Sequence, residues 1–107
     1  MIGCVLLHGA MLGRWIWDRV TTLLAVPGLA VDLPGRGAKP ADITEVTLGD
    51  AIDSVVADVE AWPIERLVLV AHSLSGILVP AVSARLARGW ALARGYGPGA
   101  GGMAVTG

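Results

Sequence analysis

The sequence has few of the features that mark a secreted or a nucleic-acid-binding protein. Its single cysteine, Cys4, cannot form an internal disulfide and lies in an apolar run, which is typical of a small buried residue in a reducing compartment. The formal net charge is -1 and the Lys and Arg residues are scattered, so we expect no nucleic-acid partner. No positive residue precedes the first apolar stretch, which argues against a signal peptide and favours a cytoplasmic location.

The sequence also lacks an apolar run of membrane-spanning length. The strongest candidate, residues 67–82, is shorter than the roughly 20 residues that such a helix needs. His72, Ser73, Ser75 and Pro80 interrupt it. We therefore interpret the run as buried protein core and expect no membrane partner.

Apolar residues dominate what is present. Hydrophobic residues make up 54% of the chain and charged residues 16%, which predicts a folded domain, and 107 residues fit one small domain. Three short apolar runs predict buried strands at residues 2–7, 29–33 and 67–71. Each precedes a segment with helical spacing, so the pattern predicts an α/β fold with parallel strands and right-handed crossovers.

The helices have recognisable limits. The first is expected over residues 13–24, and the second begins at a capping box formed by Thr47 and Asp50. The third is expected over residues 75–88, with a bend or opening in its first turns because Pro80 has no N–H to donate. From residue 89 to residue 107 the chain is rich in Gly and Ala, and we expect a loosely ordered tail after a domain over residues 1–88.

The stretch AHSLS, from Ala71 to Ser75, joins the third predicted strand to the third predicted helix. Small residues stand two positions before and two after Ser73, as a sharp strand-to-helix turn requires. Such a turn projects the Ser73 hydroxyl beyond the strand, where N–H groups at the start of the helix favour negative charge. The alternative is that Ser73 or Ser75 only caps the helix. The buried strand before it favours the turn.

A second stretch, LLHGA, ends the first predicted strand. Acyl transfer requires two N–H donors directed at the oxygen that becomes negative. The loop after this strand is a source of one donor, from Ala10, and Leu74 is a source of the other. His8 by itself is interpreted as a structural, hydrogen-bonded residue.

Four segments, VLLHGA, GRWIWDRV, VDLPGRG and LVLVAHSLSG, occur in the order and spacing of the strand-loop-helix units of α/β-hydrolases. They span about residues 2–88, so the sequence resembles the N-terminal half of that family. The stretch HGAMLGRWIWDRV is similar to a segment of plant methylesterases and hydroxynitrile lyases.

This resemblance implies a truncated α/β-hydrolase core of three parallel strands in the order second, first, third, with helices on both faces. It further implies Ser73 as nucleophile, backbone N–H groups of Ala10 and Leu74 as the oxyanion hole, and a small ester or carbonyl substrate. It implies no cofactor and no metal. Lyase chemistry on cyanohydrins stays open, because it uses the same serine.

Other noticeable residues receive structural interpretations. His72 takes the variable place in the turn and is expected to help pack it. Trp15 and Trp17 are expected to anchor the first helix, with pocket lining as the alternative. The loop over residues 34–40 contains GRGAK but lacks the P-loop pattern, so we predict a connecting loop at a pocket rim.

The sequence departs from the family after Ser73, where it holds no Asp, Glu or His. In α/β-hydrolases the acid and then the His follow the serine, and a serine without its base is a poor nucleophile. We therefore expect no ordinary esterase turnover, and the change of composition after Leu86 suggests a truncated gene or a reading-frame slip. The rival hypothesis is a catalytically inactive fragment or interaction module. An open edge beside the third strand would favour self-association.

Overall fold

A computed structural model describes residues 2–9, 11–86, 91–96 and 103–106. Its strands are β1 (Ile2–Leu7), β2 (Gly28–Val31), β3 (Arg66–His72), β4 (Ala91–Tyr96) and β5 (Met103–Thr106). Its α-helices are α1 (Asp18–Leu23), α2 (Leu48–Glu60) and α3 (Val79–Arg85). Two 3₁₀ helices, η1 (Arg14–Trp17) and η2 (Ser73–Leu78), lead directly into α1 and α3.

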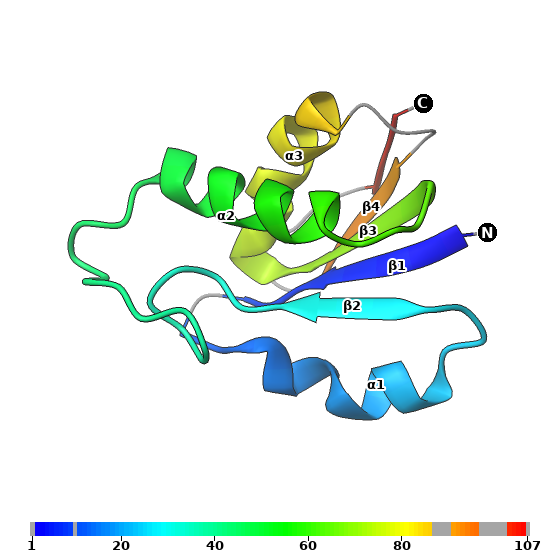
Figure 1. Cartoon of the computed structure of the whole chain (residues 1–107), viewed down its shortest axis with the longest axis horizontal. Coiled ribbons are helices and arrows are strands. Elements are labelled where there is room, and N and C mark those ends of the chain that lie inside the picture. Colours follow the sequence, from blue (N-terminus) through cyan, green and yellow to red (C-terminus); the bar gives the residue numbers. More distant parts are fainter. Residues whose placement is uncertain (1, 10, 87–90, 97–102, 107) are drawn as a thin grey trace.

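The strands form one sheet in the order β2-β1-β3-β4-β5. The first three strands are parallel and follow the order second, first, third, which confirms the predicted core (Figure 1). The sheet differs from the three-stranded prediction because β4 pairs parallel with β3 and β5 pairs antiparallel with β4. The outer edge of β3 presents unpaired backbone N–H and C=O groups, and pairing with β4 satisfies them.

The added strands come from the Gly- and Ala-rich segment. Its sequence is dominated by Gly and Ala and has no sustained period of either kind, so residues 89–107 were not predicted to form strands. The open edge expected beside the third strand is therefore wrong, because β4 pairs with β3 there. The loose ordering expected of the segment as a whole stays a prediction, and residues 87–90, 97–102 and 107 lie outside the described part of the chain.

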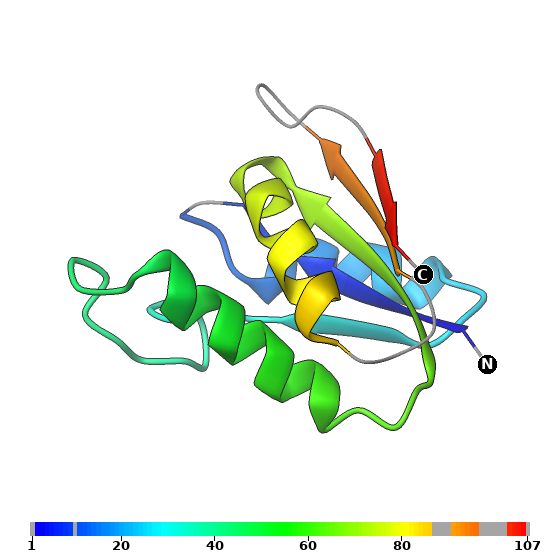
Figure 2. The ribbon, with the colours of Figure 1, turned by 90° about the horizontal axis from the view of Figure 1, so that it is seen from above.

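The helices lie on both faces of the sheet. Figures 1 and 2 show α2 and α3 together over one face and α1 alone over the other. The main core lies under α2 and α3, where buried side chains of β1 and β3 such as Val5, Leu7 and Leu69 meet Val55 and Val59 of α2. Burying such aliphatic side chains is the chief favourable contribution to folding.

Local signals explain the ends of α2. The Thr47 hydroxyl accepts a hydrogen bond from the Asp50 N–H, and the Asp50 carboxylate accepts one from the Thr47 N–H. This is the predicted capping box, and it satisfies backbone donors that the first helical turn leaves free. The helix ends at Glu60, just before Trp62 and Pro63.

The third predicted helix is divided into two parts. Residues Ser73–Leu78 form the 3₁₀ helix η2, and the α-helix begins only at Val79 with Pro80 in its first turn. Proline is tolerated in a first turn because its missing N–H would have no partner there. The predicted opening of the first turns is confirmed, although the helical segment starts at Ser73 rather than at Ser75.

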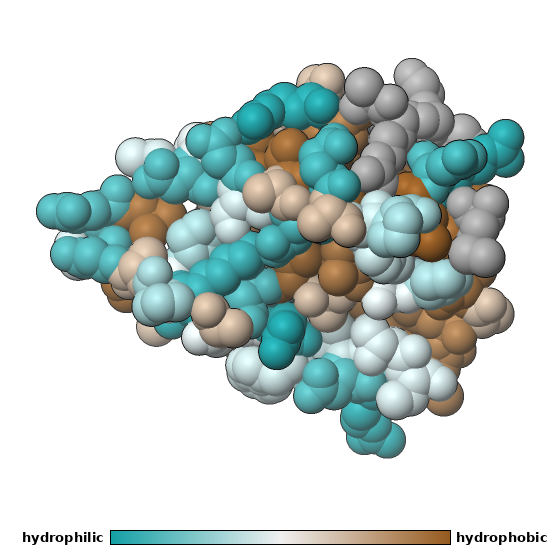
Figure 3. All heavy atoms as spheres, viewed as in Figure 1, coloured by the Kyte–Doolittle hydropathy of each residue, from teal (hydrophilic) through white to brown (hydrophobic). Residues whose placement is uncertain are grey.

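The opposite face of the sheet has a thinner cover. None of the six described residues of α1 is buried, and Leu23 is 84% exposed. Hydrophobic atoms gather on the surface over the end of α1 and its connection to β2, at the lower right of Figure 3. No helix within the described ranges combines the length and apolar character needed to cross a membrane.

Candidate active site

The carboxyl ends of β1, β2 and β3 lie at one edge of the sheet because these strands are parallel. His8 follows β1, Asp32 follows β2 and Ser73 follows β3. Ligands of open α/β sheets bind outside the carboxyl ends of the strands. A ligand or substrate site is therefore expected at this edge of the sheet.

The predicted turn at Ser73 is present in the main chain. His72 is the last residue of β3 and has extended backbone angles, and Ser73 is the first residue of η2. No loop residue separates the strand from the helix, so the chain changes direction at this point. Leu74 follows within the first turn of η2.

Three observations show that this turn lies next to the loop after β1. In the sheet Leu7 pairs with Ala71, so the chain leaves both strands at the same level. A Cβ placed on Gly9 would come within 2.5 Å of Nδ1 of His72, which shows how closely the two segments approach. The hydroxyl of Ser75, in η2, donates a hydrogen bond to the carbonyl oxygen of His8. Ala10, the other predicted donor, lies outside the described residues.

His8 is buried and both of its ring nitrogens have partners. The N–H of Leu33 donates to Nε2 at 3.0 Å, so the ring proton resides on Nδ1, which donates to the carbonyl oxygen of Gly9 at 2.8 Å. This confirms the structural interpretation of His8. With both nitrogens bonded to the backbone, the ring offers no free nitrogen as a base.

His72 is half-buried, and its ring lies against Gly9. That position agrees with its predicted role in packing the turn. Its Nδ1 is buried and has no hydrogen-bond partner among the described residues.

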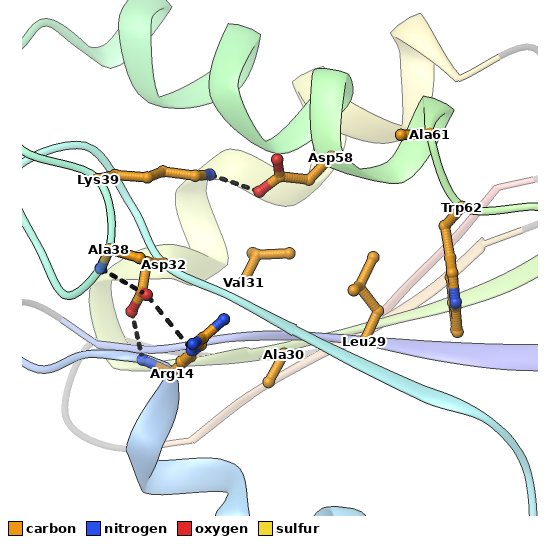
Figure 4. A pocket seen from close by; sticks show the side chains of 10 residues that line it. All are labelled: Arg14, Leu29, Ala30, Val31, Asp32, Ala38, Lys39, Asp58, Ala61 and Trp62. Carbon is orange, nitrogen blue, oxygen red and sulfur yellow. Dashed lines mark hydrogen bonds and ion pairs between the residues drawn. The ribbon is translucent and has the colours of Figure 1, made fainter.

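Asp32 organises the loop after β2. Its side chain is only 4% exposed and accepts hydrogen bonds from the N–H groups of Arg14, at 2.9 Å, and Ala38, at 3.0 Å (Figure 4). Nε of Arg14 lies 3.5 Å from its Oδ2. Desolvation alone would raise the pKa of Asp32, but the two backbone hydrogen bonds and the charge of Arg14 outweigh it and lower the pKa.

Gly37 is part of the same arrangement. It has a φ of 52°, and a Cβ there would collide with the Asp32 carboxylate. The loop therefore needs glycine at this point, both for the backbone angle and for space.

An open pocket of about 500 Å³ runs along β2 (Figure 4). The charged residues that line it are Arg14, Asp32, Lys39 and Asp58, and its apolar lining includes Leu29, Val31 and Trp62. Lys39 reaches across to Asp58 at 2.5 Å and to the hydroxyl of Ser54 at 2.6 Å. The GRGAK loop thus borders a pocket, as predicted. His8 is not among the described residues that line this pocket.

The two tryptophans of η1 have different environments. Trp17 is 8% exposed and anchors the segment, whereas Trp15 is 62% exposed. The anchoring prediction is therefore confirmed for Trp17 and wrong for Trp15. Aromatic side chains are anchors only where they are removed from water, and the helical spacing did not distinguish the two positions.

No group of three or more His, Cys, Asp or Glu side chains in the described part of the chain is placed to hold a metal ion.

Comparison with known proteins identifies the family. The sequence model of the alpha/beta hydrolase family matches residues 4–106. Esterase PIR7B of Oryza sativa subsp. japonica is 40% identical over 83 residues, which are 70% of this chain and 30% of the rice protein. Methyl jasmonate esterase 1 of Vitis vinifera is 37% identical over 86 residues, covering 70% of this chain and 31% of that one.

Solved structures agree with the sequence comparisons. The crystal structure of the methylesterase protein MES16 from Arabidopsis superposes with a TM-score of 0.68 at 29% identity, over 78% of this chain and 38% of that one. The chain belongs to the alpha/beta hydrolase family. It spans about a third of the length of these relatives.

Sequence reasoning missed two contacts of this region. The bond from Ser75 to His8 was signalled only by a serine standing where the elbow pattern G-x-S-x-G has glycine. The role of Asp32 was signalled by its place directly after a buried strand and before a Gly-rich loop. Neither signal states which backbone groups the side chain will reach.

Proposed function

We propose that this chain carries the nucleophile and the oxyanion hole of a serine hydrolase that acts on small esters. Ser73 is the nucleophile in this proposal, and the N–H groups of Ala10 and Leu74 stabilise the oxyanion. The chain spans only part of its relatives, so the activity of a complete hydrolase is included in the proposal. The cytoplasmic location remains a prediction from the sequence.

One observation carries the proposal. The strand β3 ends at His72 and η2 begins at Ser73, next to the loop that follows β1. A nucleophile at such a turn stands near backbone N–H groups of both segments, as acyl transfer requires. Relatives that bear the names esterase and methyl jasmonate esterase support an ester as the substrate class.

The lack of an acid and a His after Ser73 limits the catalytic activity of this chain by itself. No Asp, Glu or His follows Ser73 in the sequence, and both nitrogens of the His8 ring bond to backbone groups. Oxyanion stabilisation without the other triad members leaves an acceleration of about 10³ to 10⁴ over water. We therefore expect slow acylation or phosphonylation of Ser73 and no rapid turnover. The inactive interaction module is the rival, and the missing acid and His favour it.

A fluorophosphonate probe distinguishes the two. The chain and its Ser73→Ala variant are incubated with the probe at pH 8 to 9, and the modified peptide is identified by mass spectrometry. Modification at Ser73 that is faster than that of the exposed hydroxyl of Thr22 supports the proposal. If the chain and its Ser73→Ala variant are labelled to the same background level, the proposal is rejected in favour of the inactive module. Release of nitrophenol from a short-chain nitrophenyl ester then measures any turnover.

A further inference from the structure

Ser75 occupies an unusual place in the elbow. It stands two residues after Ser73, where the pattern G-x-S-x-G has its second glycine. Glycine has no side-chain donor, whereas the Ser75 hydroxyl is buried and donates to the carbonyl oxygen of His8. This chain therefore has a side-chain connection between the elbow and the loop after β1 that the family pattern does not provide.

The accepting group is well placed to influence that loop. His8 stands two residues before Ala10, to which the proposed function assigns an oxyanion donor. A peptide group is planar, so a bond that holds a carbonyl oxygen also limits rotation of the N–H on the same peptide unit. The carbonyl of His8 is held by Ser75, and that of Gly9 accepts from Nδ1 of His8 and from the N–H of Leu12.

The ring of His8 extends the connection to the loop after β2. Its Nε2 accepts from the N–H of Leu33. Through one residue, the segments that follow β1, β2 and β3 are thus joined by hydrogen bonds. Within this set, the bond from Ser75 is the one that reaches the elbow.

We propose that Ser75 is a positioning residue, whose hydroxyl holds the loop after β1 at the correct distance and orientation from the elbow. The hydroxyl does not touch the reacting atoms and acts through the main chain of His8. This role rests on the proposed function, because it concerns the geometry of the same oxyanion hole.

Four variants test the proposal. Ser75→Ala removes the hydroxyl with little change of volume, and Ser75→Gly restores the residue of the family pattern. Ser75→Thr keeps a hydroxyl and serves as the rescue variant. Ser83→Ala is the matched control, because the Ser83 hydroxyl bonds, within the part of the chain that the structure describes, only to the carbonyl of Pro80 in α3. Thermal melts establish which variants fold.

The first measurement is amide hydrogen exchange, followed by NMR. We expect exchange of the Leu12 and Leu33 amides to become about 2- to 10-fold faster in Ser75→Ala and Ser75→Gly, as loss of one hydrogen bond predicts. Amides of α2 should not change. Ser75→Thr and Ser83→Ala should exchange like the unmodified chain.

The second measurement is the rate of Ser73 modification by the fluorophosphonate. We expect it to fall on the order of 10-fold in the Ala and Gly variants, less than the loss of about 10² to 10³ when an oxyanion donor itself is removed. Recovery of the rate in Ser75→Thr supports positioning by the hydroxyl. If Ser75→Ala fails to fold, the comparison of the Gly and Thr variants decides.

The outcomes separate the two proposals. Unchanged exchange at Leu12 and Leu33 overturns the role of Ser75, and so does faster exchange with an unchanged modification rate. If the fluorophosphonate does not label Ser73 in the chain without substitutions, the proposed function is overturned instead. The exchange data then decide whether the Ser75 bond holds the loop.

Discussion

The two faces of the sheet are covered in different ways. On one face α2 and α3 bury a continuous set of aliphatic side chains against β1 and β3. On the other, α1 buries none of its six described residues, and the preceding segment is held by Trp17 and by the bond from the Arg14 N–H to Asp32. One helical layer is thus fixed by apolar burial, and the other depends on a few directed contacts. The two layers should respond differently to mutation and to pH.

Removing a side chain from the apolar layer should have the largest effect. Leu69 of β3 is fully buried in the core under α2 and α3. Leu69→Ala should lower the free energy of unfolding by about 2–5 kcal/mol, because it loses buried area and leaves a cavity. Urea denaturation measures the change. The control is Leu23→Ala, the same substitution at a residue that is 84% exposed, and an equal loss in both variants would contradict the comparison.

The polar attachment of the other layer is tested by Asp32→Asn. An amide cannot accept both backbone hydrogen bonds as the carboxylate does, and we expect a loss of about 1–3 kcal/mol at pH 7. Amide exchange should increase around Arg14 and Ala38, with little change in α2. A variant as stable as the unmodified chain would show that the layer is not held by this carboxylate.

The same residue predicts a pH dependence. The pKa of Asp32 is lowered in the folded chain, so the unfolded chain binds more protons near pH 4. The contribution of Asp32 is complete above the unfolded pKa of about 3.9 and is lost as the pH falls through the folded pKa. Urea melts between pH 6 and pH 3 should therefore show a smaller acid-induced loss in Asp32→Asn. Part of the loss should persist, because hydrogen bonds from Thr44 also lower the pKa of Asp42.

Removing one hydroxyl from each helical layer should have a smaller effect on stability, and the capping box of α2 provides the first of these two substitutions. Thr47→Ala should cost about 1 kcal/mol, because the Asp50 N–H loses its acceptor at the start of α2. Thr22→Ala in α1 removes a hydroxyl whose one bond among the described residues goes to the carbonyl of Arg19, and it should change stability by less than about 0.5 kcal/mol. Thermal denaturation of both variants gives the difference, and equal values would remove the distinction between the two helices.

The smallest expected effect on stability is that of Leu23→Lys. Leu23 is the last residue of α1 and its side chain is largely exposed, so we expect a change within about 0.5 kcal/mol. The added charge should reduce self-association. Light scattering against concentration measures the association, and a large loss of stability would show that Leu23 is packed in solution.

Much of the fold was predictable because its signals are local. Buried parallel strands appear as continuous apolar runs, as in residues 2–7 and 67–71, and the Thr47–Asp50 pair marked the start of α2. The turn at Ser73 was predicted from small residues around one serine. The strands β4 and β5 carried no such pattern, and their pairing depends on the open edge of β3.

The contacts of the site were predictable to a lesser degree. The parallel order places the ends of β1 and β3 together, so the approach of His8 to the elbow followed from topology. Which groups bond there depends on side-chain reach, and Ser75 and Asp32 could not be assigned from sequence. Burial of Trp17 rather than Trp15 likewise depends on how η1 meets the sheet.

The pairing of β1 has a consequence for how the chain acquires its structure during synthesis. The strand β1 is synthesised before both of its neighbours in the sheet, and one of them, β3, is made much later, since Ile2 pairs with Arg66. Until β3 is made, the apolar strand β1 has one unpaired edge. Contacts between residues that are distant in sequence form slowly. The interval before β3 is made is therefore the stage at which this edge of β1 is open to pairing with another chain.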